Sequence, residues 1–344
     1  MGSRANHLLR RWPAPTTSPT EHRQVTVLIL DREIEPQVDR VVEELAARDV
    51  PVFRTDLAAF PQTLTLDARL EPDGWNGTLA TPRRSVRLRE IRSVWYRHPS
   101  HFELPEGMSR PERRHAAAEA RVGVAGVLCS LDALWVNYPS READALKPRQ
   151  LDVARRCGLR VPGSLVTNTA VGVRDFAAAV GGPLAGKNLS AASLVESGHL
   201  QTAYTRRLGP AELADLAGVE TTAHLFQEFI DDKAFEVRAT VVGEQVFAAA
   251  IHAGSHAARI DFRSDYSSLD YSTIDPPPPV RTGMLAFMRM FDLSFGAFDF
   301  AVTTTGEWIM FECNPFGAYG WLEDALDLPI TSALADLLES GARP

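Results

Sequence analysis

Residues 296–315 read GAFDFAVTTTGEWIMFECNP, two apolar runs separated by a Thr-rich turn with one glycine. Residues 235–252, FEVRATVVGEQVFAAAIH, also contain two apolar runs separated by a turn with one glycine. Both patterns predict antiparallel β-hairpins. Period-two alternation puts Glu236 and Arg238 on one strand face, and it puts Asp261 and Arg263 of RIDFR on another. The C-terminal part of the chain is therefore expected to be an antiparallel sheet lobe.

The end of the second hairpin carries candidate metal ligands. Glu312 and Asn314 of IMFECNP point the same way in a strand, and Asp299 lies on the strand before them. Two carboxylates and an amide offer the oxygen ligands that Mg²⁺ prefers, together with substrate phosphates. A solvated polar strand face is the alternative interpretation.

The rest of the chain predicts an α/β organisation. VTVLILD at 25–31, the amphipathic stretch 35–49 and PVFRTDL at 51–57 form a βαβ pattern, and 110–134 is predicted to be one long amphipathic helix. Strands and helices alternate again to residue 220, and an apolar helix is expected around 284–291. We expect a disordered extension at 1–23, an N-terminal open α/β domain at 24–139, a central α/β lobe at 140–224 and the C-terminal lobe at 225–344.

Composition limits the function classes. The 344 residues carry 36 Lys plus Arg against 44 Asp plus Glu, a net charge of -8, which argues against nucleic acid or a membrane surface as the partner. No apolar run approaches the roughly 20 residues that span a bilayer. Three cysteines without a CxxC pair argue against a zinc site or a disulfide framework and favour a cytoplasmic location.

Two lysines and one apolar segment are candidates for nucleotide binding. Lys147 and Lys187 stand in apolar surroundings, in a chain whose basic residues are mostly arginine. GGPLAGKN at 181–188 departs from the phosphate-loop pattern, because Asn188 replaces its hydroxyl residue. LFQEFI at 225–230 could bind an adenine edge through its backbone, or it could be a buried strand.

The order of these elements resembles the ATP-grasp superfamily, and within it the graspetide (microviridin-type) ligases that mature ribosomal peptides. The resemblance rests on VWYRHP at 94–99, QEFIDDKAFEVRATVVG at 227–243, DFR at 261–263 and FECNPFGAYGWLE at 311–323. It covers nearly the whole chain after Arg23. Glu236 stands where the family more often has Asp, and the loop after Lys187 lacks the family's usual glycines.

The resemblance implies roles for individual residues and implies ATP and magnesium as the bound groups. Lys147 and Lys187 would neutralise the ATP phosphates, while Arg238 and Arg263 would hold the transferred phosphoryl group and the attacking carboxylate as catalytic residues. The implied ATP-binding set also contains Gln227, Glu228, Phe229, Ile230, Asp232 and Glu236; the implied metal ligands are Asp299, Glu312 and Asn314; and the candidates for substrate contact are Arg97, Asp261 and His252.

The implied activity is an ATP-dependent ligase. It would activate an Asp or Glu side chain of a precursor peptide as an acyl phosphate and close a macrocycle through an ester to Thr or Ser, or an amide to Lys. The precursor's leader segment would dock outside the active site, with the arginines at 110, 113 and 114 as one candidate contact. A ligase for free amino acids and a non-catalytic nucleotide-binding module are the alternatives. A homodimer would explain the apolar surface of the N-domain helices, and so would ordinary core packing.

Overall fold

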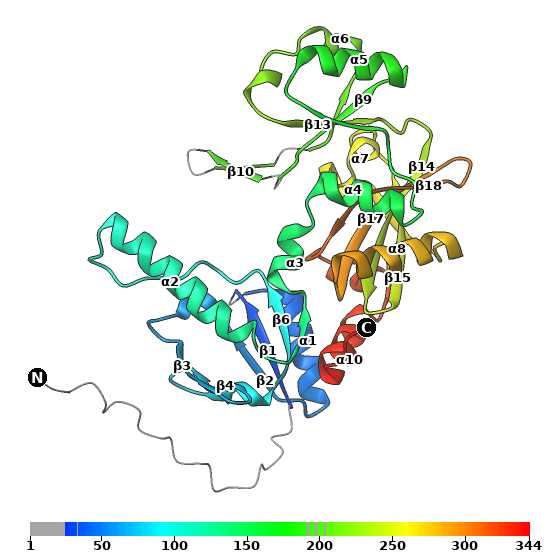
Figure 1. The fold of residues 1–344 in the computed structure, drawn as a ribbon. Coiled ribbons are helices and arrows are strands. Elements are labelled where there is room, and N and C mark those ends of the chain that lie inside the picture. The colour runs from blue at the N-terminus through cyan, green and yellow to red at the C-terminus, as the bar shows by residue number, and fades with distance from the viewer. Residues whose placement is uncertain (1–24, 33, 191–192, 197–198, 203) are drawn as a thin grey trace, which may run out of the picture.

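The computed structural model describes residues 25–344 except 33, 191–192, 197–198 and 203. The extension predicted at 1–23 lies outside the described residues. Figure 1 shows three parts, with the N-domain and the central lobe at opposite ends and the C-terminal lobe between them. The predicted three-part α/β architecture is confirmed.

The N-domain is built on a parallel sheet whose first strand is entirely buried. A second, antiparallel sheet and a long helix cover one face, and two helices cover the other. The parallel sheet has the order β2 (Val52–Thr55), β1 (Thr26–Asp31), β6 (Ile91–Arg97) and β7 (Leu134–Val136), and the second sheet has the order β3 (Thr65–Glu71), β4 (Gly74–Ala80) and β5 (Ser85–Arg87). The helices are α1 (Pro36–Ala47), α2 (Arg110–Leu128) and, from the end of the chain, α10 (Ile330–Ser340).

The helix predicted over 110–134 ends earlier, at Leu128. Ser130 and Leu131 form backbone hydrogen bonds back to Val127 and Leu128, so the chain turns there, and the apolar residues 134–136 become strand β7. Apolar spacing alone cannot separate the last helical turn from a short buried strand.

The central lobe is a four-stranded antiparallel sheet with one long helix packed on it. Its last strand begins at His224 and pairs with both of its neighbours in this sheet. The domain boundary predicted at 224/225 therefore falls inside the central sheet. The sheet order is β12 (Arg206–Leu208), β9 (Leu184–Lys187), β13 (His224–Glu228) and β8 (Ser164–Thr167); the other elements are α5 (Ala170–Val180), α6 (Pro210–Ala214) and the hairpin β10 (Ser193–Glu196) with β11 (His199–Thr202).

The C-terminal lobe is a five-stranded antiparallel sheet, as the two hairpins predicted. One face packs its apolar residues against helices that include 147–156 of the preceding sequence, and the other face carries the polar residues of the site. The strand order is β16 (Leu269–Thr273), β15 (Gln245–Ala253), β14 (Lys233–Val242), β17 (Phe295–Thr303) and β18 (Trp308–Asn314), and the helices are α3 (Pro139–Asp144), α4 (Lys147–Arg156), α7 (His256–Ile260), α8 (Pro278–Phe291) and α9 (Gly320–Leu326).

The RIDFR segment is not a strand. Helix α7 ends at Ile260 and a 3-10 turn spans Phe262–Ser264. Ser255 caps the start of α7 by accepting a hydrogen bond from Ala258 N–H, and Asp261 accepts one from Arg263 N–H. These local side-chain bonds favour helical turns over an extended chain.

Candidate active site

A cavity lies between the central sheet and the polar face of the C-terminal sheet. Both sheets, helix α4 and the turn after α7 contribute to its walls. The lining residues are Lys147, Leu151, Ala185, Lys187, Asn188, Thr205, Leu225, Gln227, Glu228, Phe229, Ile230, Lys233, Glu236, Ile260, Asp261, Phe262, Arg263, Asp299, Phe311 and Glu312.

The wall formed by the end of β13 offers unused hydrogen-bonding groups. The Gln227 side chain is buried; its Nε2 donates to Ser164 Oγ at 2.9 Å, while its Oε1 has no hydrogen-bond partner among the described residues. The N–H groups of Glu228 and Phe229 donate to backbone carbonyls, whereas the Ile230 N–H makes no hydrogen bond with any described residue. A buried acceptor and a backbone donor without a described partner therefore belong to residues that line the same cavity.

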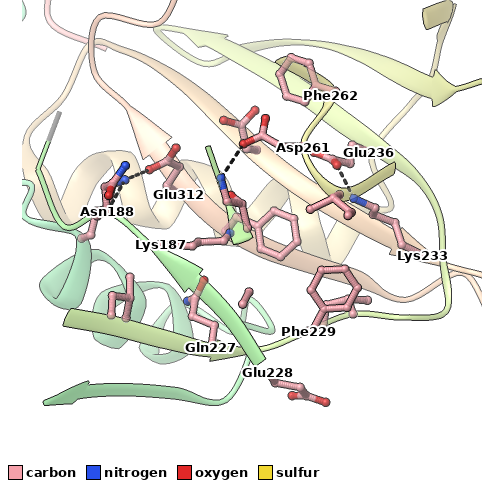
Figure 2. Close-up of a pocket in the computed structure, with 18 of the residues that line it drawn as sticks. Lys187, Asn188, Gln227, Glu228, Phe229, Lys233, Glu236, Asp261, Phe262 and Glu312 are labelled. Carbon is pink, nitrogen blue, oxygen red and sulfur yellow. Dashed lines mark hydrogen bonds and ion pairs between the residues drawn. The ribbon is translucent and has the colours of Figure 1, made fainter. Parts of the chain in front are cut away.

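All three lysines of the chain line this cavity. Lys147 Nζ donates to Asn188 O at 2.9 Å and lies 3.0 Å from Glu312 Oε2, so it connects the central lobe to β18. Lys187 Nζ lies 3.8 Å from the centroid of the Phe311 ring, and burial lowers its pKa to about 8. Lys233 forms an ion pair with Glu236 at the other side of the view in Figure 2.

The acidic end of the cavity places two carboxylates in register. Asp299 on β17 pairs with Glu312 on β18, and across its other edge it faces Arg238 on β14. Arg238 Nε lies 2.9 Å from Asp299 Oδ1, but the two atoms form no hydrogen bond. Burial raises the pKa of Asp299 to about 6. Burial acts in the same direction on Glu312, yet the charges of Lys147 and Lys187 outweigh it and hold the pKa of Glu312 below its usual value.

A second Arg–Asp pair closes the cavity from the side of α7. Arg263 donates twice to Asp261, from Nε to Oδ1 at 2.8 Å and from Nη2 to Oδ2 at 2.6 Å. Thr205 N–H of the central lobe also donates to Asp261 Oδ2, at 3.1 Å. Burial would raise the pKa of Asp261, but these bonds and the Arg263 charge lower it to about 2.

The oxygen groups fit a magnesium ion that shares its ligands with a nucleotide. In the described part of the chain, no three His, Cys, Asp or Glu side chains gather around one point. Asp299 and Glu312 supply two carboxylates, and Asp299 Oδ1 is buried without a hydrogen bond to any described residue. Mg²⁺ is commonly held by one or two carboxylates plus phosphate oxygens and water, so this set is sufficient.

Comparisons with known proteins identify the family of this chain. Residues 26–143 match the family model of the MvdD pre-ATP grasp domain. The macrocyclase MdnB from Microcystis aeruginosa MRC is 30% identical, with a TM-score of 0.74 and coverage of 92% of this chain and 99% of MdnB. The chain belongs to the family of ATP-grasp peptide macrocyclases.

Two further solved structures resemble this macrocyclase. MdnC from the same organism, solved with its precursor peptide MdnA, is 28% identical with a TM-score of 0.78, covering 91% of this chain and 98% of MdnC. A ligase from Chryseobacterium gregarium, associated with ribosomally synthesised and post-translationally modified peptides and solved with ADP and a leader and core peptide, is 25% identical with a TM-score of 0.82, covering 92% and 97%. No curated protein sequence matches the chain.

The chain gathers most of its predicted site residues around the cavity, but five lie outside its lining: Asp232, His252, Arg97, Arg238 and Asn314. Asp232 is exposed, and His252 lies beside Phe235 with its Nε2 3.2 Å from Ser272 Oγ. Arg97 is buried in the N-domain, where it donates to Phe316 O instead of reaching the cavity. Arg238 lies behind the lining, with its Nε 2.9 Å from Oδ1 of Asp299, which does line the cavity.

Asn314 lies at the end of β18, and its Oδ1 accepts a hydrogen bond from Phe316 N–H at 3.0 Å.

Sequence reasoning missed Lys233 and Phe311 as parts of the site. The signal for Lys233 was present, because it is the third lysine of a chain in which the other two were already candidates. Phe311 gave no such signal, since an aromatic residue in a strand is more commonly a core residue.

Among the described residues, every helix is too short or too polar to span a bilayer.

Proposed function

We propose that the macrocyclase uses ATP to activate Asp or Glu side chains of a ribosomal precursor peptide and joins them to Thr or Ser hydroxyls as esters, or to Lys amines as amides. The observation that carries this proposal is the convergence of all three lysines on one cavity that also holds the Asp299 and Glu312 carboxylates. Cations for phosphate and oxygen ligands for a metal are what phosphoryl transfer requires.

The adenine is proposed to lie against the end of β13. An adenine edge presents both a donor and an acceptor, which complement the unpartnered Gln227 Oε1 and the free Ile230 N–H. Phe229 and Ile230 supply apolar contact on the same wall. From there the phosphates extend toward Lys187 and Lys147.

Asp299, Glu312 and Asn314 are proposed to hold magnesium. The ion, when bound, neutralises charge on the phosphates and stabilises the phosphoryl group during transfer. Binding of the ion and the nucleotide would redistribute the present ion pairs, because Glu312 now faces Lys147 and Asp299 faces Arg238. The side chains of Lys147 and Arg238 would then face phosphate and carboxylate oxygens of the substrates.

The chemistry proceeds in two steps. The peptide carboxylate attacks the γ-phosphorus of ATP, the bond from that phosphorus to the bridging oxygen breaks, and ADP leaves an acyl phosphate on the peptide. The acceptor oxygen or nitrogen then attacks the acyl carbon, phosphate departs with the carbon–oxygen bonding pair, and the acceptor proton passes to solvent. Arg263 and Arg238 stabilise the negative charge that both steps spread over oxygen atoms. This catalysis depends on position and charge, so it requires no nucleophilic side chain of the enzyme.

The experiment is mass spectrometry of a candidate precursor incubated with the enzyme, ATP and magnesium. We expect the loss of one water mass for every bond formed, with one ADP and one phosphate released. Lys187→Met should abolish the mass loss, while Arg281→Met, which removes an exposed cation distant from the cavity, should leave it unchanged. Hydroxylamine distinguishes the products, because it cleaves esters and leaves amides intact. A gain in mass from added amino acids would contradict the proposal.

A further inference from the structure

The peptide backbone between the two metal-ligand candidates of β18 is held by a side chain from another element. Cys313 lies between Glu312 and Asn314, and both of its backbone groups bond to Gln150 of α4. Gln150 Oε1 accepts from Cys313 N–H at 2.8 Å, and Gln150 Nε2 donates to Cys313 O at 2.9 Å. Gln150 Nε2 also donates to Ala145 O at 2.7 Å. The side chain is 4% exposed, so these bonds are shielded from water.

This contact compensates for a missing neighbour strand. Strand β18 is the last strand of its sheet, so its outer edge pairs with no further strand of the described chain. Arg160 O covers that edge by accepting from Met310 N–H at 2.8 Å, and the Gln150 amide continues the cover at Cys313. A side-chain amide has one carbonyl and one N–H₂ group, so it reproduces the pairing that a peptide group of an adjacent strand would provide.

A second buried amide fixes the next turn of the chain. Asn137 Nδ2 donates to Pro315 O and to Phe295 O, both at 2.9 Å. Its Oδ1 accepts from Ser294 N–H at 2.8 Å and from Phe295 N–H at 3.0 Å. Asn137 thereby joins the start of β17, which carries Asp299, to the residue that follows Asn314. Its side chain is 1% exposed and its hydrogen-bonding capacity is full.

Helix α4 also carries Lys147, three residues before Gln150. Lys147 contacts Glu312 at 3.0 Å, so the same helix holds the side chain of one residue of β18 and the backbone of the next. Movement of the strand end relative to this helix would change the distance between the phosphate-binding lysine and the metal ligands.

We propose that Gln150 is a positioning residue that fixes Glu312 and Asn314 relative to Lys147, with Asn137 fixing the adjoining turn and the start of β17. This inference rests on the proposed function, because it assigns metal binding to Asp299, Glu312 and Asn314. Gln150 is not among the residues that line the cavity. It acts by holding the carbonyl and N–H of Cys313, so that the two ligand side chains project from a fixed backbone.

The test measures the coupling between magnesium and nucleotide instead of turnover. ADP binding is measured by calorimetry in magnesium and in EDTA, and the ratio of the two dissociation constants reports how strongly the metal site tightens binding. Gln150→Met keeps the side-chain volume and removes all three hydrogen bonds. We expect it to reduce this ratio roughly 10- to 100-fold, the usual effect of losing the support of a metal ligand. The matched control Gln62→Met removes one exposed hydrogen bond, from Gln62 Nε2 to Glu103 O, and should leave the ratio unchanged.

Each outcome decides the inference. An unchanged ratio in a folded Gln150→Met variant overturns it, whatever happens to the affinity for metal-free ADP. Gln150→Glu keeps the acceptor for Cys313 N–H and should give a ratio between wild type and Gln150→Met; if neither variant folds by circular dichroism, Gln150 is a structural residue and the inference is wrong. A wild-type enzyme whose ADP binding ignores magnesium would instead contradict the metal site of the proposed function, and this inference would fall with it.

Discussion

Two Arg–Asp pairs lie at the same cavity and differ in their hydrogen bonds and in the direction of the aspartate pKa shift. Asp261 receives two hydrogen bonds from Arg263 and a third from Thr205 N–H, and its pKa is lowered to about 2. Asp299 faces Arg238 at a similar distance without a hydrogen bond, and burial raises its pKa to about 6. The Asp261 carboxylate is fully hydrogen-bonded, and its bond to Thr205 joins two lobes. The Asp299 carboxylate faces its arginine without a hydrogen bond, as expected of a group that exchanges its partner when a ligand binds.

The largest expected effect is the loss of macrocyclisation activity when the Asp299–Arg238 pair is changed. Asp299→Asn removes a proposed metal ligand and should reduce macrocyclisation by roughly 10²–10³-fold, the scale of losing one charge-stabilising group in an active site. Unfolding should not occur at a lower temperature, because the neutral amide relieves the cost of burying this carboxylate. Mass spectrometry and thermal unfolding measure the two effects. Asp270→Asn, an exposed change on β16 of the same sheet, is the control.

Asp261→Asn should give the opposite result. An amide presents one N–H₂ group to Arg263 or to Thr205 N–H, so a donor then faces a donor. We expect the free energy of unfolding to fall by about 2 kcal/mol, measured by urea denaturation. Activity should fall less than in Asp299→Asn, since Arg263 keeps its charge. An Asp261→Asn variant as stable as wild type would show that the hydrogen-bonded pair does not join the lobes.

Lys187 extends the comparison to the cations. Its pKa of about 8 means that the free enzyme loses this charge as pH rises past 8, while the phosphates keep theirs. ADP affinity in EDTA should therefore weaken about tenfold between pH 7 and pH 9. Calorimetry across this range measures the effect. Lys187→Met should bind ADP weakly at both pH values, and persistence of the pH dependence in that variant would assign the dependence to another group.

The smallest effect is the acid stability of the Asp261–Arg263 pair. A carboxylate whose folded pKa is depressed contributes stability above its unfolded pKa of 3.8, and that stability is lost as pH falls toward about 2. Wild type should lose on the order of 1–2 kcal/mol of unfolding free energy between pH 4 and pH 2 through this group. Urea denaturation at several pH values gives the unfolding free energy as a function of pH, and this free energy should fall less steeply with decreasing pH in Asp261→Asn than in wild type. Parallel slopes would mean that Asp261 is not the responsible group.

Much of the site could be predicted from the chain because its chemistry is concentrated in a few residue types. Scarce lysines, strands with alternating acids and the ExN pair of β18 indicated phosphate and metal chemistry before any fold was known. Errors arose where local bonds or tertiary pairing decided the conformation. The RIDFR segment turns because Ser255 and Asp261 bond to nearby N–H groups, and the strand at 224–228 pairs with the central sheet although its sequence suits either lobe.

By itself, the sequence determined which groups the chain possesses and the two β-hairpins of its C-terminal lobe, since periodicity and residue type depend only on neighbours along the chain. Only the tertiary structure decided which groups keep a partner. Asp261 and Asp299 are the same type of residue, and each faces an arginine. Arg263 bonds to Asp261 within one turn, but Thr205 N–H reaches Asp261 from the central lobe, and Arg238 faces Asp299 from another strand. The same holds for Gln150 and Asn137, two amides without any local signal, which become supports of the site because the fold places them beside backbone groups of β17, β18 and the turn after β18.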